Sequence, residues 1–258
     1  MSYVSLKSEN GVATITMLRT DKYNAFIRQM ALDMQSALDV SSSDDEVRCI
    51  VITGSGKAFS AGQDLAEATD PDGPNLTKIL SEHYNPIVTR IRNIPKPIIA
   101  AVNGVAAGAG ANIALSCDIV VASESAGFIQ AFSKIGLIPD SGGTYFLPRL
   151  IGFQRASALM MLGDKLSAKD AVSMGMIYQV FPDDIFMDEV QKMASKLAKM
   201  PTFGLGLTKQ ALNKSLFNTF EQQLTLEDTL QTLAGTSEDY AEGTTAFLEK
   251  RSPKFKGI

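Results

Sequence analysis

The stretch Pro97-Ile-Ile-Ala-Ala-Val102 is apolar throughout and has the length of a strand. Such an unbroken run is typical of a strand that is covered on both faces of a parallel sheet. Two similar runs, Val47–Thr53 and Asp118–Ala122, lie before and after it, and helical spacing separates the three at Leu76–Arg92 and Ala109–Ser116. Because strands and helices alternate, the sequence predicts an α/β core with right-handed crossovers.

The pattern changes after Gly143, where helical segments follow one another. The expected helices cover Phe153–Leu162, Ala168–Met174, Ile185–Lys199, Gly206–Leu216, Phe220–Leu233 and Ser237–Lys250, with one strand over Met176–Val180. Near the start of the chain, Val12–Met17 alternates like a half-buried strand, and Asn24 is placed to cap a helix over Ala25–Val40. We therefore divide the chain into an α/β core over residues 1–200 and a C-terminal helical subdomain over residues 201–258. We expect this subdomain to pack on the core or on a neighbouring subunit.

Composition excludes several classes of function. The net charge of −4 provides no basic field, so we expect no nucleic-acid partner. The apolar runs are far shorter than the roughly 20 residues of a membrane span, and no signal peptide is visible. Cys49 and Cys117 both lie in apolar surroundings, which is typical of reduced thiols in a core. We therefore expect a cytoplasmic protein with no membrane partner.

His83 is the only histidine of the 258 residues. It lies in a helical pattern beside Glu82, and we expect it at the surface or half-buried. No cluster of histidine and cysteine has the spacing of metal ligands, so the sequence predicts no metal site.

Two loops are rich in small residues, Ser60-Ala-Gly-Gln-Asp64 and Asn103-Gly-Val-Ala-Ala-Gly-Ala-Gly110. Neither completes the glycine pattern of a dinucleotide site or a P-loop. Such loops can aim bare backbone N–H groups at one ligand oxygen, which is how an oxyanion hole is built. The same glycines are equally compatible with a structural role, in which they let a helix pack tightly on a sheet.

A third segment, Ile135-Gly-Leu-Ile-Pro-Asp-Ser-Gly-Gly-Thr144, places Asp140 between an apolar run and a glycine turn. Apolar neighbours raise the pKa of a carboxyl group, which suits an acid/base. Aspartate before a helix is also an ordinary N-cap, and the residues alone favour that reading. Asp64 can likewise cap a helix or fix a turn, while Lys57 and Lys250 are typical of solvated lysines.

Together these segments resemble the crotonase (enoyl-CoA hydratase/isomerase) superfamily, nearly from end to end. The motifs that carry the resemblance are Ala13-Thr-Ile-Thr16, Asn24-Ala25, Ser60-Ala-Gly-Gln-Asp-Leu65, Lys96-Pro-Ile-Ile-Ala-Ala-Val-Asn-Gly104, Cys117-Asp118, Gly136-Leu-Ile-Pro139, Gly142-Gly-Thr144, Leu147-Pro-Arg149 and Phe247-Leu-Glu-Lys-Arg-Ser-Pro253. The resemblance implies a crotonase-like (ClpP/crotonase) spiral of ββα units and a homotrimer or a hexamer made of two trimers. It also implies an acyl-CoA substrate, with no cofactor beyond the coenzyme A that is part of that substrate.

The resemblance assigns site residues by their position in these motifs. The oxyanion donors would be the N–H groups of Gln63 and Ala109. The coenzyme A contacts would come from Lys57 near the phosphates, from Ala61, Gly62, Gln63, Asp64 and Leu65 around the adenine, and from Phe247 and Lys250 of a neighbouring subunit. Residues 201–258 would then form a trimerisation subdomain.

Two departures from the family pattern bear on the chemistry. Members that hydrate enoyl-CoA carry two glutamates that hold and activate water, and this chain has Asn112 and Phe132 at those positions. Neither side chain can transfer a proton near neutral pH. Asp140 remains as the candidate acid/base, in a pocket that Phe128 and Phe132 would make apolar. Asn112 is expected to orient the substrate or a water molecule.

The resemblance therefore favours an acyl-CoA isomerase that works through an enolate. The stretches Ala131–Asp140, Pro201–Gln210 and Phe247–Pro253 are most similar to members that convert the ring epoxide of a phenylacetyl-CoA into an oxepin in phenylacetate catabolism. One alternative is an enoyl-CoA hydratase with an unusual base, or a Δ3-Δ2 enoyl-CoA isomerase of fatty-acid oxidation. Another is a non-catalytic subunit that binds CoA esters, since such a protein would also lack both glutamates.

Overall fold

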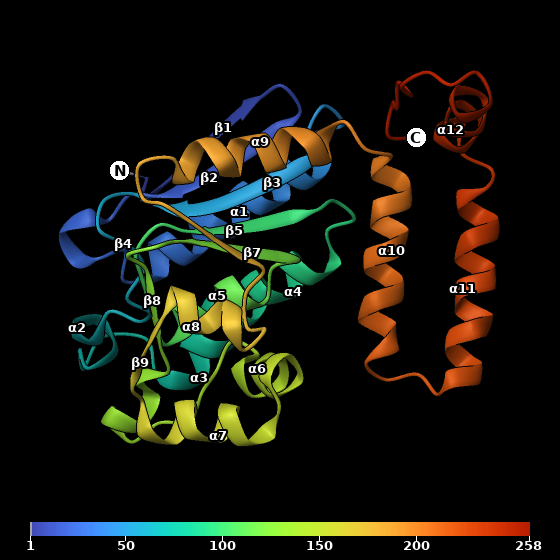
Figure 1. Ribbon diagram of the computed structural model, residues 1–258. Helices are drawn as coiled ribbons and strands as arrows, with labels where there is room; N and C mark the ends of the chain where they lie inside the picture. The colour runs from blue at the N-terminus through green and yellow to red at the C-terminus, as the bar shows by residue number, and fades with distance from the viewer. Residues whose placement is uncertain (1) are drawn as a thin grey trace.

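The computed structural model describes residues 2–258 (Figure 1). Its strands form two sheets, one in the order β1-β2-β3-β5-β7-β10 and one in the order β4-β6-β8-β9. The strands of the larger sheet are β1 (Val4–Glu9), β2 (Val12–Met17), β3 (Cys49–Gly54), β5 (Ile98–Val102), β7 (Ile119–Ser123) and β10 (Gln179–Phe181). Those of the smaller sheet are β4 (Ala58–Ser60), β6 (Val105–Ala107), β8 (Gly127–Ile129) and β9 (Lys165–Ser167).

The helices connect and cover these sheets. They are α1 (Arg28–Ser43), α2 (Leu65–Ala68), α3 (Leu76–Lys78), α4 (Asn85–Asn93), α5 (Ala109–Leu115), α6 (Gly143–Ile151), α7 (Phe153–Leu162), α8 (Ala168–Ser173), α9 (Phe186–Ala198), α10 (Thr202–Ser215), α11 (Phe220–Ala234) and α12 (Glu238–Leu248). Two short 3-10 helices, η1 (Thr20–Lys22) and η3 (Ala131–Ile135), and a π-helix, η2 (Ile79–Tyr84), complete the set.

The chain alternates between the two sheets. The strand β3 enters the larger sheet, β4 enters the smaller one, and a helix follows; β5, β6 and α5 repeat this order. All pairings in the larger sheet are parallel except that of β1 with β2, and in the smaller sheet only β9 runs antiparallel to its neighbour. This arrangement confirms the predicted α/β class and the spiral of ββα units.

The strand β3 shows why its sequence is apolar without interruption. Ile50 and Ile52 belong to the core that α1 and α4 cover, whereas Cys49 and Val51 belong to a second core beneath α9. All four side chains are fully buried. Because burial of one such isoleucine contributes about 1.5–3 kcal/mol, a polar residue on either face of this strand would be destabilising.

The predicted helix cap at Asn24 is wrong. The helix α1 begins at Arg28, and its N-cap residue is Ile27. Asn24 is buried, and its Nδ2 donates hydrogen bonds to the carbonyl oxygens of Ser55 and Ala58, at 3.0 and 2.8 Å. The amide therefore stabilises the turn between β3 and β4, a contact 31 to 34 residues away along the chain that no local pattern indicates.

The helix predicted over residues 76–92 is divided into α3, the π-helix η2 and α4. A π-turn carries one extra residue and changes the direction of the following side chains, and such turns are frequent at functional sites. His83 lies within it and is fully buried, so the prediction of a surface or half-buried position is wrong. The strand expected at Met176–Val180 lies at Gln179–Phe181, and the sequence did not predict β9.

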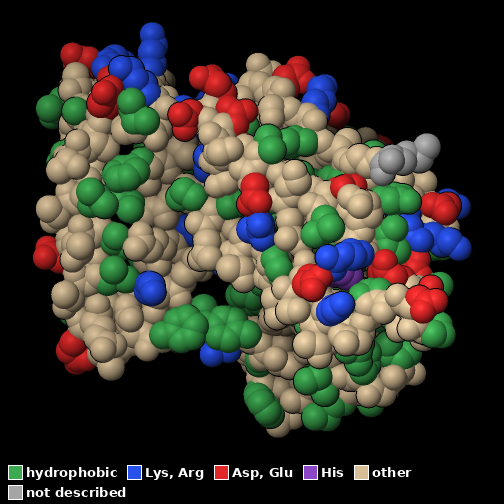
Figure 2. Space-filling view, turned by 180° about the vertical axis from the view of Figure 1, so that it is seen from behind, with side chains coloured by type: hydrophobic (Ala, Val, Ile, Leu, Met, Phe, Trp, Pro, Cys, Tyr) green, Lys and Arg blue, Asp and Glu red, His purple; other side chains and the backbone are tan. Residues whose placement is uncertain are grey.

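The last three helices stand to one side of the sheets, as Figure 1 shows for α10 and α11. In Figure 2 a hollow separates this pair from the rest of the chain, and hydrophobic side chains cross it at one point. Tyr145 of α6 and Phe217, just beyond α10, stack with ring centroids 5.7 Å apart. The division of the chain near residue 200 and the role of residues 201–258 in trimerisation stay predictions.

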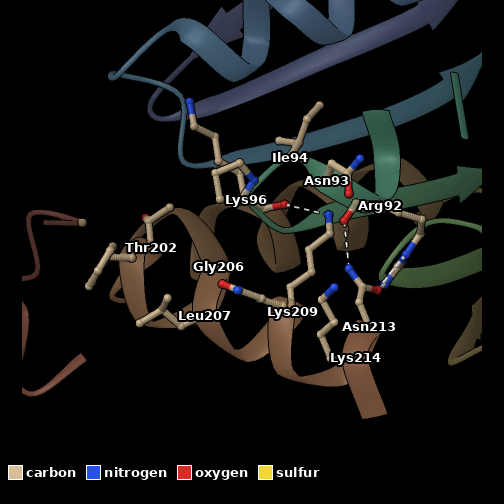
Figure 3. Close-up of a pocket in the computed structure, with 14 residues that line it drawn as sticks. Arg92, Asn93, Ile94, Lys96, Thr202, Gly206, Leu207, Lys209, Asn213 and Lys214 are labelled. Atoms are coloured by element: carbon tan, nitrogen blue, oxygen red, sulfur yellow. Dashed lines mark hydrogen bonds between the residues drawn. The ribbon is translucent and has the colours of Figure 1, made fainter. Parts of the chain in front are cut away.

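A polar network attaches α10 to the core (Figure 3). Lys209 is buried, and its Nζ lies 2.8 Å from Asp118 Oδ2 and 2.7 Å from the carbonyl oxygen of Ile91. Asn213 bonds through its side chain to the main chain and guanidinium of Arg92, which itself pairs with Asp118 at 3.0 Å. The ammonium group of Lys209 therefore holds α10 against α4 and against the residue that precedes β7.

We predict that Lys209→Met destabilises the protein by about 3 kcal/mol, because loss of one partner leaves a buried charge poorly compensated. The measurement is equilibrium urea unfolding at pH 7. Lys214→Met is the matched control, since Lys214 is exposed on the same helix, and it should stay within about 0.5 kcal/mol of the wild type. Equal stability of the two variants would contradict the anchoring role.

Candidate functional site

Three separate segments meet at one cavity of about 560 Å³. The first small-residue loop contributes Ala61 and Gln63, the second contributes Gly108 and Ala109, and the segment before α6 contributes Asp140. Hydrophobic side chains form most of the remaining wall: Leu65, Leu76, Ile79, Leu80, Phe132, Ile135, Leu137 and Ile138. The structure thus brings together the three segments that the sequence singled out.

The two small-residue loops touch through their backbones. Gly62 has φ +86°, and a Cβ atom there would lie 2.9 Å from the carbonyl oxygen of Ala107 and 3.3 Å from the nitrogen of Ala109. Gly108 has φ +52° and ψ −127°, a conformation that is accessible to glycine. Glycine at these positions therefore permits the close packing that the sequence offered as a structural role, and the use of these loops as an oxyanion hole stays a prediction.

Gln63 and Ala109, the predicted oxyanion donors, both line this cavity. Within residues 2–258, neither N–H donates a hydrogen bond to a protein acceptor. The N–H of Ala109 is the first of α5, where a helix leaves its donors unpaired. Two unpaired donors at one cavity are the arrangement that can stabilise an oxyanion.

The side chain of Gln63 is held at both ends of its amide. Its Oε1 accepts a hydrogen bond from the hydroxyl of Tyr84 at 2.8 Å, and its Nε2 donates to Glu67 at 3.1 Å. Tyr84 is fully buried and packs edge-on against Phe26, with ring centroids 5.8 Å apart. Burial raises the pKa of Tyr84 well above its ordinary value, and the charge of Asp140 adds to this effect, so the phenol stays a donor.

Asp140 is half-buried in the cavity wall. Its carboxylate Oδ1 accepts a hydrogen bond from the hydroxyl of Ser141 at 2.8 Å, and its carbonyl oxygen accepts from Gly143 N at 2.8 Å. Gly142 is the N-cap residue of α6, without any side-chain capping bond, so the N-cap alternative for Asp140 is wrong. Burial raises the pKa of Asp140, while the bond from Ser141 opposes that rise.

Asn112 lies behind Asp140. It is fully buried, its Nδ2 donates to the carbonyl oxygen of Asp140 at 2.9 Å, and its Oδ1 accepts from Gln130 at 2.8 Å. A Cβ on Gly143 would lie 2.3 Å from that Nδ2, so α6 can pack this closely only with glycine. Asn112 does not line the cavity, and both ends of its amide bond to protein.

The residues assigned to the coenzyme A end differ in their surroundings. Ala61 and Leu65 line the cavity, but Lys57 is exposed and lies outside it. Asp64 caps α2 by accepting from Ala66 N and pairs with Arg19 at 2.6 Å. Although partial burial acts to raise it, the hydrogen bond from Arg19 brings the pKa of Asp64 below its ordinary value. The carboxylate of Asp64 therefore has a structural role in addition to its place in the loop.

Phe247 lies in the last turn of α12 and Lys250 just beyond the helix, both outside the cavity that contains Asp140. Both are exposed, and Phe247 borders a separate hollow against α10 and the tail residue Phe255. Within one chain they do not reach Asp140. Their predicted contact with the coenzyme A of a neighbouring subunit stays a prediction.

Sequence reasoning missed Tyr84, Ser141 and Gln130 as members of this site. Ser141 lies in the quoted segment around Asp140, so its neighbourhood gave a signal. Tyr84 and Gln130 gave none, because their roles depend on contacts with Gln63 and Asn112, 21 and 18 residues away.

Other polar features of the described chain form no comparable site. The cavity of Figure 3, of about 460 Å³, has four cationic side chains in its wall, Arg92, Lys96, Lys209 and the exposed Lys214, and the first three bond to protein oxygens. Burial lowers the pKa of His83, and neither of its ring nitrogens has a hydrogen-bond partner. Among residues 2–258, no group of three or more His, Cys, Asp or Glu side chains could hold a metal ion. No helix of that range has the length and apolar character needed to cross a membrane.

Comparison with known proteins gives consistent results. The family model described as enoyl-CoA hydratase/isomerase matches residues 7–258. The chain is 50% identical over 260 residues to the 1,2-epoxyphenylacetyl-CoA isomerase of Escherichia coli strain K12, covering 100% of this chain and 99% of that protein. It is 35% identical to the 2,3-dehydroadipyl-CoA hydratase of the same strain, with full coverage of both.

A crystal structure of enoyl-CoA hydratase from Bacillus anthracis matches with a TM-score of 0.92 and 30% identity, covering 100% of both chains. Sequence and fold therefore agree over the whole length. This chain belongs to the enoyl-CoA hydratase/isomerase family, the crotonase superfamily of enzymes.

Proposed function

We propose that this enzyme is a 1,2-epoxyphenylacetyl-CoA isomerase, in which Asp140 moves the proton. The observation that carries the proposal is a single carboxylic acid in a largely apolar cavity, together with two unpaired backbone N–H groups. The relative that is 50% identical over the full chain bears that name, which supports the same choice of substrate.

In the proposed reaction, the thioester carbonyl oxygen lies between the N–H groups of Gln63 and Ala109. The carboxylate of Asp140 takes a proton from the carbon next to that carbonyl, and the two donors stabilise the charge that develops on oxygen. The carbon–carbon bond that the six-membered ring shares with the epoxide breaks, which expands the ring to a seven-membered oxepin. The enolate electrons form a double bond from the α-carbon to the ring, the neighbouring ring double bond is used up, and Asp140 returns the proton to the ring carbon at its far end, the γ-carbon of the thioester. Because the proton is taken and returned, substrate and product have the same composition.

Asn112 acts in this proposal through Asp140 rather than on substrate. Its amide holds the carbonyl oxygen of Asp140, and Gln130 holds the amide in turn. Together with Gly143 N, this bond fixes the main chain that carries the base. Asn112, at the position of a glutamate in enoyl-CoA hydratases, thus holds the main chain of Asp140 in place.

The coenzyme A portion of the substrate would extend from the cavity past Ala61 to Leu65 and Lys57, with Phe247 and Lys250 supplied by a neighbouring subunit. We propose a cytoplasmic homotrimer or hexamer, in which the helical subdomain makes the subunit contacts. The exposed apolar side chains of Leu212 on α10, Phe220 on α11 and Phe217 between these helices support an interface there.

Asp140→Asn should lower kcat for 1,2-epoxyphenylacetyl-CoA by about 10²- to 10⁴-fold, since amides cannot replace a general base. Binding of the CoA ester should be retained, because no coenzyme A contact changes. Substrate loss followed by chromatography measures the rate. The control is Asp188→Asn on α9, far from the cavity, and a wild-type rate in Asp140→Asn would refute the role of Asp140.

The same substitution should stabilise the protein at neutral pH. Burial raises the folded-state pKa of Asp140 above its ordinary value of 3.8, so folding favours the neutral acid. The stability gained from this is full below that value and is lost as the pH rises through the folded-state pKa. At pH 7 Asp140→Asn should therefore melt at a higher temperature than the wild type, and the difference should shrink at pH 3.5. A lower melting temperature of Asp140→Asn than of the wild type at pH 7 would contradict the claim that burial disfavours the ionised Asp140 carboxylate.

Crotonyl-CoA separates the proposed isomerase from an enoyl-CoA hydratase. With Asn112 and Phe132 in place of the two glutamates, hydration should be slow or absent, because neither side chain activates water. Loss of the absorbance of the conjugated thioester reports hydration. Hydration faster than epoxide isomerisation would favour the hydratase, and CoA-ester binding without turnover of either substrate would favour a non-catalytic subunit.

A further inference from the structure

The turn that contains Asp140 has a serine, Ser141, with a positive φ. Asp140 to Gly143 form a turn closed by the bond from Gly143 N to the Asp140 carbonyl oxygen, at 2.8 Å. Both central residues have positive φ, +53° at Ser141 and +76° at Gly142. Such turns are dominated by glycine, asparagine and aspartate. Glycine is therefore expected at position 142, where a Cβ would also lie only 2.8 Å from the Phe146 side chain. The backbone conformation gives no reason for a serine at position 141.

The side chain of Ser141 provides the reason. Ser141 is only 2% exposed, it lines the cavity, and its hydroxyl donates to Asp140 Oδ1 at 2.8 Å. Among residues 2–258, Ser141 is the only residue whose side chain donates a hydrogen bond to the Asp140 carboxylate. Residues held in the left-handed region outside glycine are strained, and such strain tends to persist at functional sites.

We propose that Ser141 is a positioning residue, whose left-handed backbone places its hydroxyl against Asp140 so that the carboxylate is oriented and its ionised form is stabilised. This inference rests on the proposed function, in which Asp140 is the base. It concerns Ser141, and how its hydrogen bond opposes the effect of burial on the ionisation of Asp140.

The electrostatics of the cavity agree with this role. Burial raises the pKa of Asp140, and the hydroxyl of Ser141 is the foremost group that lowers it. The titratable groups that line the cavity near Asp140 are Tyr84 of η2, a neutral donor bonded to Gln63, and Lys134 of η3, which is exposed. The helices α5 and α6 present Asn112 and Gly143 to it, neither of which titrates.

Two substitutions separate the hydroxyl from the strain. Ser141→Ala removes the hydroxyl and keeps a Cβ at positive φ, whereas Ser141→Gly removes both. If the hydroxyl is what matters, both variants should show the same upward shift of the Asp140 pKa. The glycine variant should melt at the higher temperature, because glycine adopts this φ freely. It therefore keeps the test open if the alanine variant folds poorly.

The experiment measures the pKa of Asp140 directly, by carbon-13 NMR titration of protein labelled in its aspartate carboxyl groups, with Asp140→Asn assigning the resonance. The pH profile of kcat/KM for 1,2-epoxyphenylacetyl-CoA is measured alongside. We expect the NMR pKa and the acidic limb of the profile to move upward together in both Ser141 variants. Ser133→Ala, which removes an exposed hydroxyl outside the cavity, should leave the NMR pKa unchanged.

An unchanged NMR pKa in both Ser141 variants would overturn the inference, even if Asp140→Asn is inactive. An upward NMR shift in a protein whose Asp140→Asn variant remains fully active would support the bond and refute the proposed function instead. A shift in the glycine variant alone would also overturn the inference, because the loss of the Cβ rather than the loss of the hydroxyl would then be the cause. The two proposals therefore fail through different measurements.

Discussion

The candidate site depends on the contact of two backbones at Gly62. With a Cβ at this position, the first loop would meet the carbonyl oxygen of Ala107 at 2.9 Å, so the loops could not lie this close. Their contact puts the N–H groups of Gln63 and Ala109 at the same cavity. The buried parallel sheet makes the contact possible, since β4 and β6 are adjacent strands whose C-terminal ends lead into these two loops. Fold and site are thus linked through one glycine.

Asp140 illustrates how a carboxyl group is held in an apolar wall. Burial disfavours its charge, while the hydroxyl of Ser141 favours it, and the carbonyl oxygen of the same residue is held by Asn112 and Gly143. Main chain and side chain are thus controlled by different partners. Tyr84 and Glu67 similarly hold the side chain of Gln63, so partly buried hydrogen bonds support both candidate residues.

Sequence reasoning succeeded where the signal was periodic and failed where it depended on distant contacts. The apolar run of β5 and the helix over Phe153–Leu162 agree with the structure because burial imposes its pattern residue by residue. Asn24, read as a cap, instead bonds across the turn between β3 and β4, and His83 is buried by a π-helix that interrupts an otherwise helical pattern. The C-terminal helices were found, but their attachment through Lys209 and Asp118 joins residues 91 positions apart.

The sequence by itself determined the α/β class, the family resemblance and the identity of the one acid in the candidate site, because these depend on residue type, order and spacing. It left the role of Asp140 open between base and helix cap. Only the tertiary structure excluded the helix cap, by placing Gly142 at the cap and Asp140 in the cavity wall. The physical reason is that a carboxyl group's environment is set by what folds around it. Burial by η2 and η3 and a hydrogen bond from a strained neighbour cannot be read from one stretch of chain.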